Sequence, residues 1–253
     1  MLVYGCLALC TVGLGLIVYR YDMYEREPWY MLLLALMAGM LSCLLIGYFE
    51  DYLFASLSLG AQQLGQQAVL VAVSEELIKL LAVIGIAVLC RSQFNDPMDG
   101  LIYGTFVGLG FGLEESLFYL GLDSANLRLD RFGEVPVRLL LHLLFGGLGG
   151  FAIGLARFPD RWRAWPLIFG ICLGTAITIH ALWDYWLGLR INDPLPDAWQ
   201  QLAAISLMGT LTLAFGGLVI LGVRWSREIF VPKRSKRLWG WPFSLLFRDG
   251  GPE

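Results

Sequence analysis

Apolar runs long enough to cross a membrane recur along the chain, and polar or proline-bearing breaks separate them. A transmembrane helix needs about 20 apolar residues to cross a hydrocarbon core of about 30 Å. The stretch from Glu50 to Gln67 has only a short apolar part before several glutamines, so we expect an interfacial helix or a loop there. The pattern predicts transmembrane helices near residues 2–19, 29–48, 68–90, 99–121, 135–157, 165–189 and 202–223, about seven spans in all.

The first apolar run resembles a secretion signal in length. It lacks a basic segment before it and a convincing cleavage site after it, so we interpret it as a helix of the mature bundle.

Composition agrees with this pattern. Hydrophobic residues make up 57% of the 253 residues and charged residues 15%, and the mean hydropathy is +0.66, which is too apolar for an ordinary soluble domain. We therefore expect an all-α fold: a polytopic transmembrane helix bundle in the cell membrane, forming one domain over residues 1–223. A basic, aromatic tail over 224–253 should follow, with 233–237 against anionic headgroups. No nucleic-acid partner is expected.

Basic residues indicate the orientation. Arg20, Arg26, Arg91 and most tail cations fall on one side of a seven-span bundle, which the positive-inside rule makes cytoplasmic. The N-terminus is then outside and the C-terminus cytoplasmic. Basic residues between the fourth and fifth spans run against this count: Arg128, Arg131 and Arg138.

Titratable side chains lie inside several of the apolar runs. An ionised side chain at the bilayer centre costs roughly 2.5–3.5 kcal/mol, so such residues indicate a functional site. They are Glu75, Glu76 and Lys79 in the third run, Glu114 and Glu115 in the fourth, His142 in the fifth, and His180 and Asp184 in the sixth. At about 1.5 Å per residue, the main candidates lie roughly 8–16 Å below the outer ends of their spans. We therefore predict one cavity that opens toward the external face.

Spacing within the helices suggests pairs. Glu75 and Lys79 are four residues apart, so Lys79 can pair with this carboxylate, whereas Glu76 is turned by about 100° and need not face the same cavity. His180 and Asp184 have the same spacing, which lets the carboxylate orient the imidazole. A Glu–Lys pair can also be purely structural, and an intramembrane histidine can serve only as an interhelical hydrogen bonder.

Other motifs have structural interpretations. Asp96 before Pro97 predicts a helix cap, with Asp99 in the first turn. The five cysteines form no Cys-x-x-Cys motif and are interpreted as packing residues. Two glycine series at four-residue spacing predict close helix packing: Gly104, Gly108 and Gly112, and Gly146, Gly150 and Gly154.

Carboxylates and imidazoles in a poorly hydrated cavity can transfer protons and activate water. A glutamate could take a proton from water, and a histidine could stabilise the oxyanion or protonate the leaving amine. His142, His180 and Glu115 could instead hold a divalent metal such as zinc. No His-Glu-x-x-His motif is present, which slightly favours the mechanism without metal.

Several motifs occur in one order between about residues 68 and 188: Glu75-Glu76-x-x-Lys79, Asp99-Gly100-x-x-Tyr103-Gly104, Gly110-Phe111-x-x-x-Glu115, His142, and His180-x-x-x-Asp184. This arrangement resembles the PrsW family of intramembrane proteases, which is related to CAAX prenyl endopeptidases and bacteriocin-processing membrane proteins. Ser116 stands where family members often carry Asn.

The resemblance implies a catalytic site made of Glu75, Glu76, Glu115, His142 and His180, with Lys79, Asp184 and Phe111 in support. It also implies cleavage of a membrane-spanning substrate, in the best-known cases an anti-sigma factor. The family has been described both as glutamate-dependent and as metal-dependent.

We therefore expect an intramembrane endopeptidase that cuts its substrate near the external face through a Glu-activated water. A proton-coupled transporter is the main alternative, because mid-membrane carboxylates and histidines also build proton relays. The polar groups cluster at one depth and no inverted repeat is evident, which favours the protease. A non-catalytic scaffold that binds partners through its tail is a third hypothesis.

Overall fold

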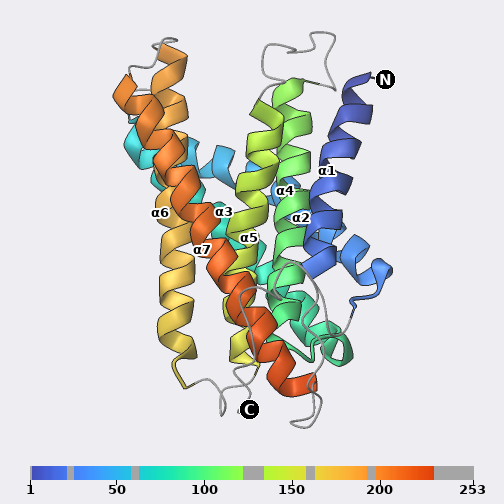
Figure 1. The fold of residues 1–253 in the computed structure, drawn as a ribbon. Helices are drawn as coiled ribbons and strands as arrows, with labels where there is room; N and C mark the ends of the chain where they lie inside the picture. The colour runs from blue at the N-terminus through green and yellow to red at the C-terminus, as the bar shows by residue number, and fades with distance from the viewer. Residues whose placement is uncertain are drawn as a thin grey trace.

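A computed structural model describes residues 2–21, 26–57, 63–121, 134–157, 163–192 and 198–230. Within these ranges the fold is all-α, without strands, and successive long helices run in alternating directions (Figure 1). The helices are α1 (Leu2–Tyr21), α2 (Trp29–Leu57), α3 (Leu64–Leu89), the short 3-10 helix η1 (Arg91–Gln93), α4 (Pro97–Leu120), α5 (Val135–Ala156), α6 (Trp165–Asn192) and α7 (Ala198–Phe230).

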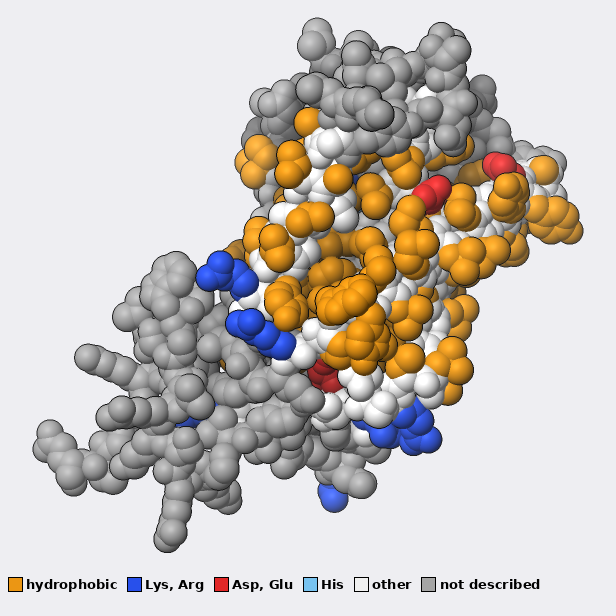
Figure 2. Space-filling model, turned by 90° about the vertical axis from the view of Figure 1, so that its right-hand side faces the viewer, with side chains coloured by type: hydrophobic (Ala, Val, Ile, Leu, Met, Phe, Trp, Pro, Cys, Tyr) orange, Lys and Arg blue, Asp and Glu red, His pale blue; other side chains and the backbone are white. Residues whose placement is uncertain are grey.

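The long helices confirm the predicted polytopic membrane bundle. Four of them contain segments that are long and apolar enough to cross a membrane, namely Trp29–Leu57, Val135–Ala156, Trp165–Leu187 and Ile205–Arg227, and α1 holds the shorter apolar segment Gly5–Arg20. Large hydrophobic side chains also cover the outside of the bundle, where lipid tails would contact them (Figure 2). The predicted orientation of the termini stays a prediction.

The expectation of a separate loop or interfacial helix after residue 48 is wrong for the described residues. Residues 50–57 continue α2, and α3 already begins at Leu64. Glu50 belongs to the bundle because the Ser74 hydroxyl of α3 donates a 2.5 Å hydrogen bond to its carboxylate. Helix α7 likewise runs to Phe230, past the predicted end at 223. The expected headgroup contact of 233–237 lies outside the described residues.

Glycines bring α4 and α5 into backbone contact, as the four-residue spacing predicts. A Cβ atom added at Gly104 would lie 2.3 Å from the carbonyl oxygen of Gly146, and one at Gly108 only 1.9 Å from that of His142. Helix α2 packs equally closely on the other side of α4, where a Cβ atom at Gly110 would lie 1.9 Å from the oxygen of Leu36. Helix α4 is therefore the central element of the fold.

The start of α4 is capped as expected. The Asp96 carboxylate accepts a 2.7 Å hydrogen bond from the Met98 amide, and the Asp99 carboxylate accepts a 2.7 Å bond from the Asp96 amide. Further side chains tie this end to its neighbours: the Tyr103 hydroxyl donates to Glu27, and the Ser226 hydroxyl of α7 donates to Asp96. This buried polar cluster fixes one end of α4, and the candidate site lies toward its other end.

Candidate active site

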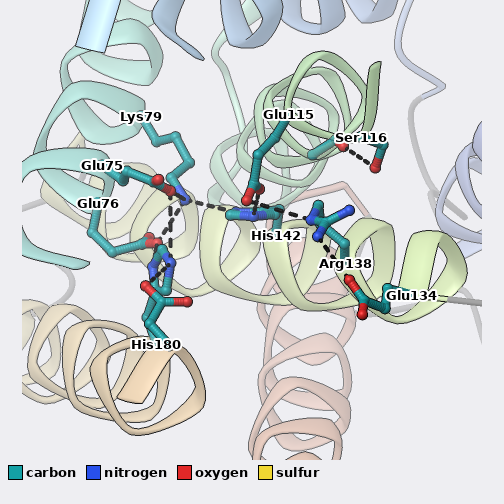
Figure 3. A network of polar contacts seen from close by, with 11 residues as sticks. Glu75, Glu76, Lys79, Glu115, Ser116, Glu134, Arg138, His142 and His180 are labelled. Atoms are coloured by element: carbon teal, nitrogen blue, oxygen red, sulfur yellow. Dashed lines mark hydrogen bonds and ion pairs between the residues drawn. The ribbon is translucent and has the colours of Figure 1, made fainter. Parts of the chain in front are cut away.

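Four helices bring the predicted site residues into one buried network of polar contacts (Figure 3). Its members are Glu75, Glu76 and Lys79 of α3, Glu115 of α4, His142 of α5, and His180 and Asp184 of α6. The side chains are withdrawn from the surface: Lys79 is 1% exposed, and His142 and His180 are 4% and 3% exposed. The site residues that the sequence placed at a common depth in the membrane are thus in direct contact with one another.

Lys79 lies at the centre of this network. Its Nζ atom is 2.6 Å from Oε1 of Glu76, 2.9 Å from Nδ1 of His142 and 3.6 Å from Oε2 of Glu75. The expected Glu75–Lys79 ion pair is therefore present, but Glu76 is the closer partner and faces the same site. The two carboxylates, although offset around the helix axis, both reach the ammonium because their side chains are long.

The contacts of Lys79 also determine how His142 is protonated. An ammonium group has no acceptor, so Lys79 must donate to Nδ1 of His142. The proton of a neutral ring then lies on Nε2, which donates to Oε2 of Glu115 at 2.5 Å. The ammonium also lies 4.3 Å from the centre of the Phe111 ring, which is a cation–π contact.

His180 is held by a different pair of carboxylates. Its Nδ1 atom donates to Oε1 of Glu76 at 2.8 Å, and its Nε2 atom lies 3.3 Å from Oδ2 of Asp184 and 3.6 Å from Oε2 of Glu75. The ring stacks on Phe145 with centroids 5.0 Å apart and planes 12° apart. Glu76 thus orients the ring from one side, together with Asp184 on the other.

The two adjacent glutamates differ in what they can still accept. Glu76 Oε1 already accepts hydrogen bonds from Lys79 and His180. Oε2 of Glu75 is buried and has no hydrogen-bond partner among the described residues. The Nζ atom of Lys79 and the Nε2 atom of His180 each lie 3.6 Å from it. Glu75 is therefore the carboxylate with capacity left for a water molecule or a metal ion.

The donor atoms also fit a divalent metal. One ligand atom from each of Glu75, His142 and His180 lies within 4.8 Å of the others, and all three residues are buried. Two imidazoles and a carboxylate are a typical ligand set of catalytic zinc. The sequence suggested Glu115 as the carboxylate of this set; in the structure Glu115 instead accepts from the His142 ring, a contact that would orient a metal-bound imidazole.

The polar side chains of the site are closely packed in the described part of the chain, and the predicted opening of a cavity toward the external face stays a prediction. The cavity beside Glu76, Lys79 and Phe145 has a volume of about 10 Å³, which is room for about one water molecule. The polar side chains contact one another directly and leave little space between them.

Sequence reasoning missed two contributors to the site. Arg138 was counted only as a loop cation, but it is 8% exposed and its Nε atom lies 3.4 Å from Oε1 of Glu115. Its position four residues before His142, on the same face of α5, was the available signal. Glu50, which accepts a hydrogen bond from Ser74 next to Glu75, falls in the stretch expected to be an interfacial helix or a loop, and the sequence gives no comparable signal for its contact.

The fold and the buried network define a class, that of enzymes which work inside a membrane-embedded helix bundle. A family model described as PrsW family intramembrane metalloprotease matches residues 27–216. The chain belongs to this family and is a protease, in agreement with the resemblance of its motifs. It is accordingly a multi-pass protein of the cell membrane.

Individual relatives agree with the family match. "Protease PrsW" of Geobacillus kaustophilus (strain HTA426) is 29% identical over 177 residues, covering 69% of this chain and 76% of the relative. "Protease PrsW" of Bacillus subtilis (strain 168) is 30% identical over 186 residues, covering 71% and 81%. No solved structure matches the chain.

Proposed function

We propose that the protease hydrolyses a peptide bond of a membrane-spanning protein near the external membrane face, through a water molecule activated by Glu75. The observation that carries this proposal is the buried network in which Glu75, His142 and His180 meet around Lys79. The resemblance of the motifs favours an anti-sigma factor as the substrate.

Each residue has a role that follows from its contacts. Glu75 has the free acceptor oxygen and takes the proton from water. Glu76 holds Lys79 and His180 in place. His142 would stabilise the oxyanion once its Nε2–H donates to the substrate in place of Glu115. His180, when it carries a second proton on Nε2, would protonate the leaving amine.

A metal ion is compatible with the same residues. Glu75, His142 and His180 would hold it, and both ring nitrogens of His142 have partners, so the ion would replace one of them. A bound divalent ion would supply a nucleophile by acidifying a bound water. The description of the family as intramembrane metalloproteases supports keeping this alternative beside the metal-free one.

Metal analysis separates the two alternatives. With a metal site, purified protein should contain about one equivalent of zinc or another divalent ion, and a strong chelator should abolish cleavage. The His180→Ala variant should then lose the metal as well as activity. Full activity of metal-free protein would leave water activation to Glu75 alone.

The position of the site favours a cut near one end of the substrate helix. Glu115 precedes the end of α4 by little more than a turn, and His142 lies about two turns from the start of α5, so both are near the same end of the bundle (Figure 1). In the predicted orientation this end is external. Deeper cleavage would expose backbone groups to hydrocarbon at several kcal/mol each.

The proposal is tested by a cleavage assay in vesicles with a panel of single-pass membrane proteins. The wild type should cut at least one of them, and the Glu75→Gln, Glu76→Gln double variant should be inactive. Mass spectrometry of the products should place the cut in the external half of the substrate span or just beyond it. A cut in the cytoplasmic half would overturn either the orientation or the assignment of the site.

A further inference from the structure

The guanidinium of Arg138 has one buried nitrogen without a hydrogen-bond partner. The side chain is 9% exposed, its Nε atom lies 3.4 Å from Oε1 of Glu115, and its Nη2 atom lies 3.4 Å from Oε2 of Glu134. The Tyr119 ring covers one face at 4.6 Å. Nη1 is buried and has no acceptor among the residues that the structure describes.

The partner that Nη1 lacks is a neutral hydrogen-bond acceptor, not an anion. Glu115 and Glu134 already face the single positive charge of Arg138, so a further anion would meet two carboxylates. A buried donor left without a partner still costs free energy. The group that suits this position is therefore a neutral oxygen acceptor, such as a peptide carbonyl.

Arg138 lies close to His142, one of the proposed reacting groups. Arg138 and His142 are one turn apart on the same face of α5, and both contact the Glu115 carboxylate (Figure 3). Four residues of helix correspond to about 6 Å along its axis. An extended chain advances about 3.3 Å per residue, so about two residues would span that distance.

We propose that Nη1 of Arg138 donates a hydrogen bond to a main-chain carbonyl oxygen of the substrate, about two residues from the scissile bond. The inference rests on the proposed cleavage of a membrane-spanning substrate. Such a substrate must leave the helical conformation before its main chain can be attacked, and its carbonyl groups then lose their partners where no water replaces them. Arg138 supplies one donor there, already held in place by Glu115, Glu134 and Tyr119.

The test compares Arg138→Lys with the wild type on the membrane-spanning substrate that the wild type cuts. Lysine keeps the positive charge near the two glutamates but lacks the second donor arm. We expect KM to rise roughly ten- to hundredfold, as for the loss of one hydrogen bond to a charged group, with kcat, the pH–rate profile and the cut site unchanged. Arg91→Lys, the same substitution at an exposed arginine beyond α3, is the matched control and should leave all four unchanged.

A KM that Arg138→Lys leaves unchanged would overturn the inference. An effect on kcat and the pH–rate profile alone would also overturn it, because Arg138 would then act only through Glu115. Vesicles of phosphatidylcholine with and without phosphatidylglycerol should give the same KM ratio. An effect that requires the anionic lipid would assign Nη1 to a lipid phosphate instead.

A second measurement does not depend on the folding of the variant. A benzophenone side chain placed one to three residues from the cut in the substrate should crosslink to wild-type α5 around Arg138. Crosslinks confined to α6 or α7 would overturn the inference while leaving the proposed function intact. If the wild type cuts no membrane-spanning protein, the proposed function fails and this inference fails with it.

Discussion

The two halves of the site are held together in different ways. Glu115 and His142 lie on α4 and α5, whose backbones touch through glycines, and 78% of the span in α5 is buried. Glu75, Glu76, Lys79 and His180 lie on α3 and α6, and only 22% of the span in α6 is buried. Gly170 and Gly174 of α6 face open space. The α4–α5 half is therefore the more tightly packed of the two. The α3–α6 half is joined to it by the polar site residues as well as by apolar contacts of the shared core.

The largest effect is expected at the point where the halves meet. Lys79→Met removes the contacts to His142 and to both glutamates, and leaves Glu76 buried without its cation. Breaking a buried ion pair by removing one partner costs about 3–5 kcal/mol. We expect a large fall in thermal stability in detergent and loss of cleavage, both measured on the purified protein.

The double variant Lys79→Met, Glu76→Gln is the matched control. It removes both charges of the closest pair, so it should recover part of the lost stability but not the activity. Wild-type stability and activity of Lys79→Met would show that the two halves are joined by other contacts.

A smaller effect is expected from disturbing the glycine contact. In Gly108→Ala the new methyl group would lie 1.9 Å from the carbonyl oxygen of His142, so α4 and α5 must move apart. Such overpacking costs about 1–3 kcal/mol, occasionally more. Cleavage should fall with it, because the shift displaces His142 relative to Lys79.

Gly174→Ala is the control on the other half, where nothing lies within 4 Å of an added Cβ atom. We expect its stability to stay within about 0.5 kcal/mol of the wild type or to rise slightly, with activity retained. Equal losses in the two alanine variants would show that α4–α5 is not the more tightly constrained half.

The smallest effect is expected at the edge of the α3–α6 half, where α2 contacts it. Ser74→Ala removes the hydrogen bond to Glu50, which should cost about 0.5–1.5 kcal/mol and leave cleavage almost unchanged. Ser56→Ala, at an exposed serine of α2, should be neutral. A strong loss of activity at normal stability would instead place Glu50 among the reacting groups.

The helices were predictable because each long apolar run has one stable form in a membrane. The sequence pattern was not sufficient where polar residues continue a helix. Glu50 lies within α2 and accepts a hydrogen bond from Ser74 of α3, a long-range contact that no local pattern shows. The pattern likewise predicted that the last helix ends near residue 223, whereas α7 continues to Phe230.

Depth within the membrane was also predictable, since it depends only on the rise per residue. Contacts between helices were not. They depend on how each helix is rotated and how near its neighbours come, and glycine contacts between α4 and α5 set both. The sequence therefore predicts that His142 and Glu115 lie at one depth. It does not show that Arg138 contacts the Glu115 carboxylate or that Lys79 contacts His142.

The pairing of Lys79 with Glu76 inside a single helix also bears on how the chain enters the membrane. During synthesis α3 is made before α5 and α6, so neither His142 nor His180 is present when α3 meets the lipid. Lys79 and Glu76 are three residues apart and 2.6 Å from each other, so this pair can form within the helix alone. The nascent segment then carries one uncompensated charge, that of Glu75, in place of three, which lowers the free energy of its insertion before the enzyme is complete.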